Sequence, residues 1–287
     1  YSVSLNSGTD ALILSLRALD LPKGSEVITS AHTFWATLEA IYHNNLIPIL
    51  TDIDEDGLMD VASIKNLITE KTSAIIPVHI AGNVVNCQSL YQYQIPIIED
   101  SCQSLGASDL QGHIACYSFY PAKILGAYGD AGAIVTNDIH LAEKIRLLRN
   151  HGGKPEPWYV GYNSRMDNIQ ASILNVKFKY INEALKARKT IAGMYDSLLG
   201  DLPVVKPKKR DVYQDYIILT EKRDELKDNL EKEGIETMKD EYPFKFNDKK
   251  PEKTLEWERS ALRLPCNETL NDDDIIYIGN SIRKFFN

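Results

Sequence analysis

Short runs of apolar and β-branched residues recur through the first half of the chain, and segments with helical spacing separate them. The runs predict strands at residues 3–5, 26–29, 47–52, 73–80, 96–100, 115–119 and 133–137. The segments 10–18, 33–43 and 61–68 are predicted to be helical. Near-continuous apolar strands that alternate with helices indicate a mainly parallel sheet covered on both faces, in which ligands collect at the carboxyl ends of the strands.

A long helix is predicted next, at residues 166–199. Its apolar positions keep roughly helical spacing, which predicts one buried face. These positions are Met166, Ile169, Ile173, Val176, Ile181 and Leu185.

The pattern changes after this helix. A strand at 211–220, a charged helix at 224–233 that Gly234 ends, and a strand at 235–238 are followed by a closing helix at 271–286. Asn271 is the expected N-cap of the closing helix. We therefore predict a large domain at residues 1–178 and a smaller α+β domain at residues 179–287.

Composition narrows the class of protein. A hydrophobic fraction of 44% with 25% charged residues is ordinary for a globular chain of 287 residues. The formal net charge of −8 argues against a nucleic-acid surface. We found no apolar run long enough to span a bilayer and no export leader, so we expect a cytoplasmic protein. The scattered cysteines favour reduced thiols over a disulfide framework or a metal site.

Two segments could meet the ends of a ligand. The segment 6–12 runs from a strand into a helix, and its small and hydroxyl residues would leave backbone N–H groups free for a phosphate. Taken alone, it is equally an ordinary helix N-cap. Asp100 ends an apolar strand, where it could pair with a ligand cation or cap the next turn.

Lys123 follows a predicted strand and is surrounded in sequence by aromatic and small residues. Most lysines lie on solvated surfaces, but removing an amine from water favours the neutral form that can bond to a carbonyl. The segment 161–167, which introduces the long helix, reads alone as a polar turn.

Together these segments resemble the DegT/DnrJ/EryC1/StrS family of pyridoxal 5′-phosphate (PLP) sugar aminotransferases. The resemblance is carried by colinear segments at residues 6–12, 32–37, 97–103, 118–132 and 161–166. Pro77-Val78-His79 and Leu264-Pro265 also fall where the family has similar segments. The resemblance implies the aspartate-aminotransferase type of α/β fold (fold type I), with a seven-stranded sheet, a smaller C-terminal domain and active sites shared across a homodimer.

The resemblance also implies roles for single residues. Lys123 would hold PLP as a Schiff base and then move the proton between the substrate carbon and the cofactor. Asp100 would pair with the pyridine nitrogen, and Gln103 would lie near the 3′-oxygen. Phe34 would stack on the ring, with Trp35 as its rival.

The phosphate contacts implied by the family come from several elements. They are the backbone amides of Gly8 and Thr9, the hydroxyl of Ser118, and Asn163 of the neighbouring subunit, with Arg165 in the same corner. No metal is implied. The reaction would move an amino group from an amino acid, in this family usually glutamate, to C3 or C4 of a nucleotide-linked keto sugar.

Two other functions remain open at this point. One is a PLP-dependent sugar dehydratase of the same fold, in which relatives carry histidine at the position of Lys123. The other is a non-catalytic regulatory or binding member of the family, because a fold can be shared without its chemistry. The sequence also departs from the family: Glu241 stands where many relatives have histidine, and we assign it no role.

Overall fold

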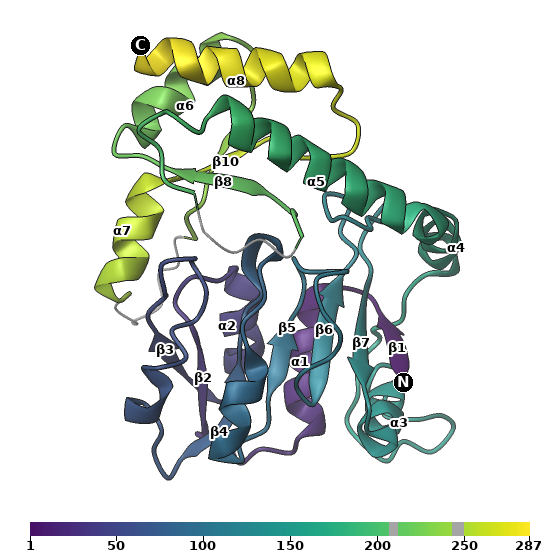
Figure 1. The fold of residues 1–287 in the computed structure, drawn as a ribbon. Coiled ribbons are helices and arrows are strands. Elements are labelled where there is room, and N and C mark those ends of the chain that lie inside the picture. The colour runs from purple at the N-terminus through teal and green to yellow at the C-terminus, as the bar shows by residue number, and fades with distance from the viewer. Residues whose placement is uncertain (207–211, 243–249) are drawn as a thin grey trace.

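The computed structural model describes residues 1–206, 212–242 and 250–287, and its larger part is built on strands that match the predicted ones (Figure 1). The strands are β1 (Ser2–Leu5), β2 (Glu26–Ser30), β3 (Ile47–Thr51), β4 (Thr72–Ile76), β5 (Ile98–Asp100), β6 (Ile114–Ser118) and β7 (Gly132–Thr136). Each of the seven predicted apolar runs is therefore confirmed as a strand. The run at 73–80 is shortened most, because β4 ends at Ile76.

The strands pair in the order β3-β2-β4 and β1-β7-β6-β5. Parallel bridges from Ile75 to Ile97 and from Val78 to Asp100 join β4 to β5, so the two groups form one continuous layer of seven strands. The pairs β2–β3, β2–β4 and β5–β6 are parallel, whereas β7 is antiparallel to both β6 and β1. The predicted mainly parallel sheet is confirmed, with β7 as its reversed strand.

Helices α1 (Gly8–Ala18), α2 (Trp35–His43) and α3 (Ile139–Leu148) pack on this layer and share a core with it. The predicted helix at 61–68 was wrong. Only a short 3-10 turn, η1 (Ile64–Asn66), forms there. Asp60 explains the difference, because its side chain accepts from the backbone N–H of Ala62 and its carbonyl accepts from the Ser63 hydroxyl. Such local bonds compete with a helix.

The predicted long helix is two helices, α4 (Asn168–Lys177) and α5 (Ile181–Leu198), joined by the 3-10 turn η4 (Phe178–Tyr180). The break lets α5 pack against α8 while α4 stays beside the larger part. The prediction of one buried face fails for α4 in the single chain. Ile169 is 72% exposed and Val176 is 58% exposed.

The C-terminal part lies over one end of the large sheet (Figure 1). It contains an antiparallel sheet in the order β8-β10-β9, with β8 at Tyr216–Leu219, β9 at Met238–Lys239 and β10 at Ala261–Leu264. Its helices are α6 (Arg223–Lys232), α7 (Glu252–Ser260) and α8 (Asp272–Phe286). Two further 3-10 helices, η2 (Ile80–Gly82) and η3 (Cys87–Tyr93), belong to the larger part.

Most predicted elements of this part are confirmed, and two were missed. The strand predicted at 211–220 is confirmed only at Tyr216–Leu219, and residue 211 lies outside the described residues. The strand predicted at 235–238 was misplaced, because β9 shares only Met238 with it. Asn271 caps α8 in a capping box with Asp274, as the N-cap prediction expected. Helix α7 and strand β10 were not predicted.

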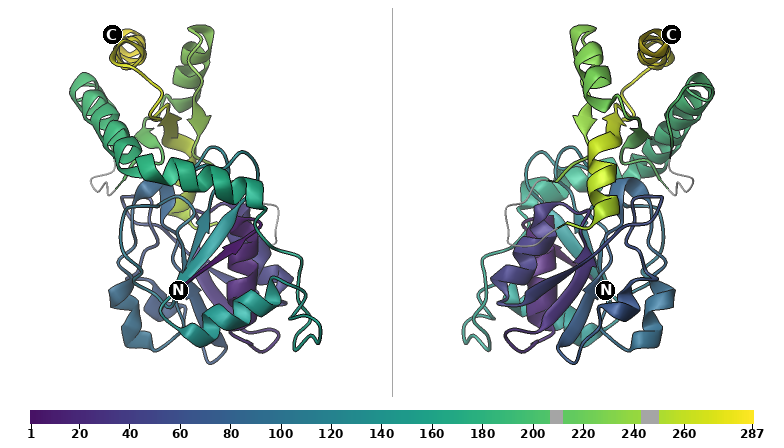
Figure 2. Two further views of the ribbon diagram at one scale, coloured as in Figure 1. Left: turned by 90° about the vertical axis from the view of Figure 1, so that its right-hand side faces the viewer. Right: turned by 90° about the vertical axis from the view of Figure 1, so that its left-hand side faces the viewer.

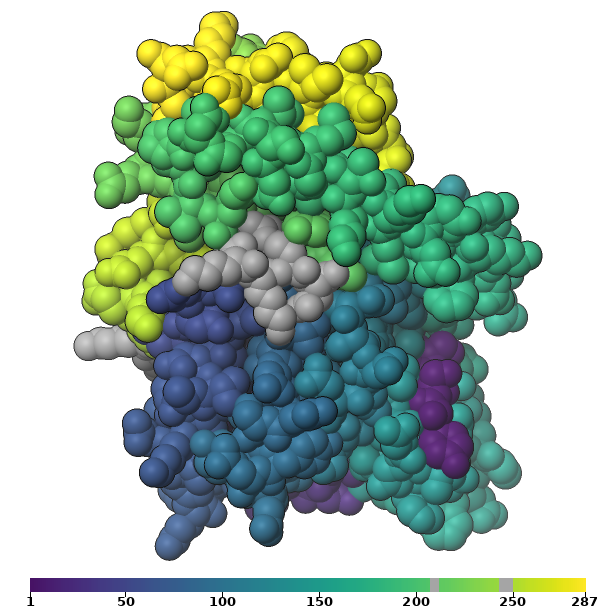
Figure 3. All heavy atoms as spheres, in the orientation of Figure 1, coloured from purple at the N-terminus to yellow at the C-terminus, as the bar shows by residue number. Residues whose placement is uncertain are grey.

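The main apolar core of the C-terminal part is separate from that of the larger part. It draws residues from α5, β8, α6, β10 and α8, and its three helices fan out above the two strands in Figure 2. The space-filling view shows the same C-terminal residues seated on the larger part (Figure 3). The domain boundary between residues 178 and 179 stays a prediction. No helix among the described residues is long and apolar enough to cross a membrane.

Candidate active site

A pocket of about 540 Å³ opens where the carboxyl ends of β5 and β6 meet the start of α1. The C-terminal part closes its other side. Seven of the predicted site residues line it: Gly8, Thr9, Phe34, Asp100, Gln103, Ser118 and Lys123. Parallel strands that end at one edge explain why residues so far apart in sequence meet here.

The start of α1 forms one end of the pocket. Ser7 is its N-cap and accepts from the backbone N–H of Asp10 at 3.0 Å. A Cβ on Gly8 would lie 2.7 Å from Cβ of Ser118, so only glycine lets the helix approach the end of β6 so closely. The first N–H groups of a helix lack acceptors within the helix and attract anions. With the Ser118 hydroxyl beside them, they suit a phosphate.

Asp100 brings a carboxylate to the pocket from the end of β5, and only 6% of the residue is exposed. The Thr37 hydroxyl donates to its Oδ2 at 2.7 Å, and the backbone N–H of Cys102 donates to its Oδ1 at 3.2 Å. Asp100 therefore caps a turn and also lines the pocket, and its pairing with a ligand cation stays a prediction. Burial, and then the charge of Asp100, raise the pKa of the Cys102 thiol.

Gln103 is buried, and its amide orientation is fixed by a backbone donor. Its Oε1 accepts from the N–H of Ala81 at 2.8 Å, and its Nε2 donates to the Tyr242 hydroxyl at 3.3 Å. The amide nitrogen carries two protons, so Gln103 can give the second one to a ligand oxygen in the pocket.

Phe34 lines the pocket and is 43% exposed, whereas Trp35 does not line it. The two rings contact each other with centroids 4.4 Å apart, and Phe34 meets Tyr242 edge-on. An exposed aromatic face at this position is suited to stack on a flat ring. The geometry favours Phe34 over its rival.

Asn163 lies elsewhere. It is exposed, forms an isolated bridge with Asn150, and accepts a hydrogen bond from Arg165 at 3.3 Å. Neither Asn163 nor Arg165 lines the pocket of the single chain. The expected contribution of Asn163 to the neighbouring subunit stays a prediction.

A buried charge network on the C-terminal side of the pocket was missed by sequence reasoning. Arg263 donates to Asp240 through Nε at 2.8 Å and to Asp215 through Nη1 at 3.0 Å, and it also contacts the Tyr242 hydroxyl. Asp240 also accepts from the Trp257 indole at 2.8 Å. These residues come from separate strands and loops, so no local sequence signal unites them.

The network shifts the pKa values of its members. Burial alone would raise the pKa of Asp240, but Arg263 and His32, whose Nε2 lies 3.2 Å from its carboxylate, hold that pKa well below its usual range. Burial would also lower the pKa of Arg263, yet Asp240, Tyr242 and Asp215 keep it well above its ordinary value. Burial raises the pKa of Tyr242 to about 12, so its hydroxyl stays protonated at neutral pH.

We expect Asp240→Asn to lower the free energy of unfolding by about 3–5 kcal/mol at neutral pH, because it removes one partner of a buried ion pair. The folded pKa of Asp240 lies below its unfolded value of 3.8. The stability that Asp240 contributes is therefore complete above the unfolded pKa and is lost as the pH falls through the folded pKa. The variant should therefore lose less stability on acidification than the wild type, measured by urea unfolding at several pH values. Asp201→Asn, at an exposed partner of Arg283, is the control and should change stability little. Equal acid sensitivity of Asp240→Asn and wild type would contradict the assignment.

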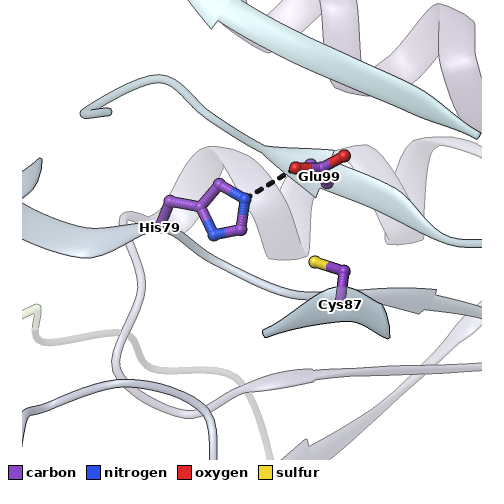
Figure 4. A group of neighbouring side chains, drawn as sticks. All are labelled: His79, Cys87 and Glu99. Carbon is purple, nitrogen blue, oxygen red and sulfur yellow. Dashed lines mark hydrogen bonds and ion pairs between the residues drawn. The ribbon is translucent and has the colours of Figure 1, made fainter. Parts of the chain in front are cut away.

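His79, Cys87 and Glu99 gather in a buried cluster whose potential metal-ligating atoms lie within 4.8 Å of one another (Figure 4). The Nδ1 atom of His79 accepts from the N–H of Val85 at 3.1 Å, so its Nε2 carries the proton and donates to Glu99 at 2.8 Å. The other Glu99 oxygen accepts from the backbone N–H of Gln111. Burial, and then Glu99, raise the pKa of the Cys87 thiol. Since these bonds use both ring nitrogens and both carboxylate oxygens, the cluster braces the loop beside Gln103 and does not suit a cation.

The groups that the pocket presents match those of PLP. The cofactor has a phosphate, a ring nitrogen that can be protonated, a ring oxygen that accepts hydrogen bonds, and an aldehyde. The α1 N-terminus with Ser118, the Asp100 carboxylate, the Gln103 amide and the Lys123 amine supply one matching group each.

Comparisons with known proteins identify the family of the chain. Residues 1–283 match the model of the DegT/DnrJ/EryC1/StrS aminotransferase family. A pleiotropic regulatory protein of Geobacillus stearothermophilus is 37% identical over 318 residues, covering 100% of this chain and 85% of that protein. The dTDP-3-amino-3,4,6-trideoxy-alpha-D-glucose transaminase of Streptomyces venezuelae is 32% identical over 314 residues, covering 99% and 83%.

Among solved structures, S. venezuelae DesV in complex with a ketimine intermediate superimposes with a TM-score of 0.92 at 31% identity. The match covers 99% of this chain and 84% of DesV. The predicted seven-stranded fold class is thereby confirmed. The chain belongs to the DegT/DnrJ/EryC1/StrS aminotransferase family and has the aspartate-aminotransferase type of fold, fold type I of the PLP-dependent enzymes.

Proposed function

We propose that this chain is a PLP-dependent transaminase that moves an amino group from an amino acid, glutamate, to C3 or C4 of a nucleotide-linked keto sugar. The observation that carries the proposal is the meeting of Lys123, Asp100 and the start of α1 on one pocket. The names of transaminase relatives that act on dTDP-linked and UDP-linked sugars support the substrate class.

Each pocket residue has a role in this proposal. Bound PLP supplies an electron-accepting ring that stabilises negative charge on the substrate carbon. Asp100 keeps the ring nitrogen protonated, which strengthens that acceptance. Gln103 donates to the 3′-oxygen, and Phe34 covers one ring face.

The remaining roles concern anchoring and proton movement. Gly8, Thr9 and Ser118 hold the phosphate. Lys123 would hold the cofactor through its amine, and the same amine would carry the proton at the substrate carbon. A lysine at this position favours transamination over the dehydratase, whose family members carry histidine there.

The regulatory alternative is favoured by the names of two relatives, the pleiotropic regulatory protein of Geobacillus stearothermophilus and the erythromycin biosynthesis sensory transduction protein EryC1 of Saccharopolyspora erythraea. A protein that only binds partners has no chemical need for a lysine, a carboxylate and a phosphate-binding helix start in one pocket. We therefore place the enzyme first.

Absorption spectroscopy tests the function. Purified protein with PLP is expected to absorb visible light, to bleach when glutamate is added, and to regain its colour when a nucleotide-linked keto sugar accepts the amine. Mass spectrometry should then detect the amino sugar. The same keto sugar without its nucleotide is the control for substrate class. A protein that stays colourless with added PLP would rule the proposal out.

We further propose a homodimer in which Asn163 completes the partner's phosphate site. Support comes from apolar side chains that the single chain leaves exposed on α4 and the adjoining turn η4. They are Ile169, Val176, Phe178 and Tyr180, each at least 58% exposed. Large apolar side chains that gather in exposed positions on one element are typical of a protein interface.

Mixing two defective variants tests the shared site. Lys123→Ala and Asn163→Asp are each expected to be nearly inactive, the second because its added charge repels the phosphate. After subunit exchange, about one quarter of the sites would combine an intact Lys123 with an intact Asn163, given a symmetric dimer with random pairing. Activity should therefore reappear on mixing. Lys123→Ala mixed with itself is the control, and a mixture that stays inactive despite proven exchange would contradict the shared site.

A further inference from the structure

We propose that Gln214 is a positioning residue for Lys123, because its side-chain amide holds the backbone on both sides of the lysine. The Oε1 atom of Gln214 accepts from the N–H of Ile124 at 3.2 Å, and its Nε2 donates to the carbonyl of Ala122 at 3.0 Å. A backbone N–H only donates and a carbonyl only accepts, so the orientation of the amide is fixed. This inference rests on the proposed function of Lys123.

Burial makes these two bonds costly to break. Gln214 is 9% exposed and Ile124 is 3% exposed. A buried backbone or amide group that loses its partner and meets no water destabilises the fold. The backbone around Lys123 therefore cannot shift without leaving polar groups unpaired on both sides.

Gln214 is itself firmly held. Its carbonyl accepts from Nη1 of Arg188 at 3.1 Å, and the same nitrogen donates to the carbonyls of Tyr213 and Cys266. Arg188 lies on α5 and is 4% exposed. The two bonds from Gln214 to the neighbours of Lys123, which together we call the clamp, are therefore anchored through buried Arg188 in the C-terminal part.

The lysine loop also has supports within the larger part. The N–H of Lys123 donates to the carbonyl of Tyr120 at 2.8 Å, which closes a turn. Lys177 donates to the carbonyl of Gly126 at 2.6 Å, and a Cβ on Gly126 would lie 2.2 Å from the carbonyl oxygen of Pro121, so the loop is tightly folded. Gln214 adds the link that reaches across the pocket from the C-terminal part, joining residues 90 and 92 positions apart.

This arrangement suits the work of Lys123. The amine must leave the cofactor and carry a proton, so the side chain has to move while its Cα stays in place. Misplacement of a reacting group by about 1 Å can cost roughly a hundredfold in rate. A clamp on the neighbouring backbone fixes the origin of the side chain and leaves the amine free to move.

The test measures bond formation between Lys123 and PLP directly. Full-length protein without cofactor is mixed with PLP, the bond is trapped with borohydride at timed intervals, and modified Lys123 is measured by mass spectrometry. Gln214→Met, which keeps the size and removes both hydrogen bonds, should lower the trapping rate about tenfold, the effect of roughly 1.4 kcal/mol. Gln214→Asn keeps the amide but not its reach, so it should show a similar loss and serves if the methionine variant is insoluble.

Gln170→Met is the matched control. Gln170 accepts from the N–H of Tyr128 at 2.9 Å, so it holds the same loop without touching the neighbours of Lys123, and its variant should trap at the wild-type rate. Hydrogen exchange gives a readout without cofactor: the Ile124 amide should be protected in the wild type and exchange faster in Gln214→Met.

The outcomes separate the two proposals. Wild-type trapping at Lys123 together with an unchanged rate and unchanged Ile124 protection in Gln214→Met would overturn the role of Gln214 and leave the proposed function standing. A wild type that forms no bond at Lys123 would overturn both.

Discussion

Lys123→Ala is expected to form no covalent bond with PLP and to slow amino transfer by on the order of 10⁴-fold, the upper range for loss of a general acid–base group. Lys123 lines the same pocket as Asp100 and the start of α1. The variant loses both the anchor for the cofactor and the carrier for the proton. Single-turnover kinetics with glutamate and borohydride trapping measure the two losses separately.

Binding itself should survive in this variant. The helix start, Ser118 and Asp100 remain, so equilibrium dialysis should detect PLP held without a covalent bond. Lys177→Ala removes another lysine that bonds the same loop at Gly126 and should still show covalent attachment. If visible absorbance and trapping persisted unchanged in Lys123→Ala, another lysine would be the anchor.

Asp100→Asn is expected to lower the rate of amino transfer by about two to four orders of magnitude, since breaking a buried ion pair costs roughly 3–5 kcal/mol and each 1.36 kcal/mol is tenfold. Asparagine keeps the size and can still accept from Thr37, but it lacks the charge that would hold a proton on the ring nitrogen. Unlike Lys123→Ala, this variant should retain the covalent bond at Lys123. Trapping compared with turnover therefore distinguishes the two roles.

Two controls bracket this prediction. Thr37→Val removes the hydroxyl that orients Asp100 and keeps the charge, so a smaller loss is expected. Asp109→Asn neutralises an exposed carboxylate away from the pocket and should leave the rate unchanged. Near-wild-type turnover in Asp100→Asn would mean that this carboxylate only caps the turn at Cys102.

The strands in the first half of the chain could be predicted because the sequence pattern that specifies them is local. A short apolar, β-branched run has few ways to bury itself other than as a strand, and each of the seven strands coincides with such a run. Lys123, Asp100 and Ser118 were assigned to one site by the family resemblance, and the structure brings them to one pocket because strand ends converge in a sheet of this kind. The helix predicted at 61–68 failed where Asp60 and Ser63 supplied competing local bonds.

The amino-acid sequence by itself thus determined the succession of strands along the chain, the residues at the ends of these strands, and the family. Only the tertiary structure decided how the C-terminal part closes the pocket. Gln214 bonds the backbone of the loop that carries Lys123, and Arg263 contacts Asp215, Asp240 and Tyr242. Those contacts join buried polar groups from elements far apart in the chain. Their partners are set by how two separate cores pack together, and no periodicity along the sequence encodes that packing.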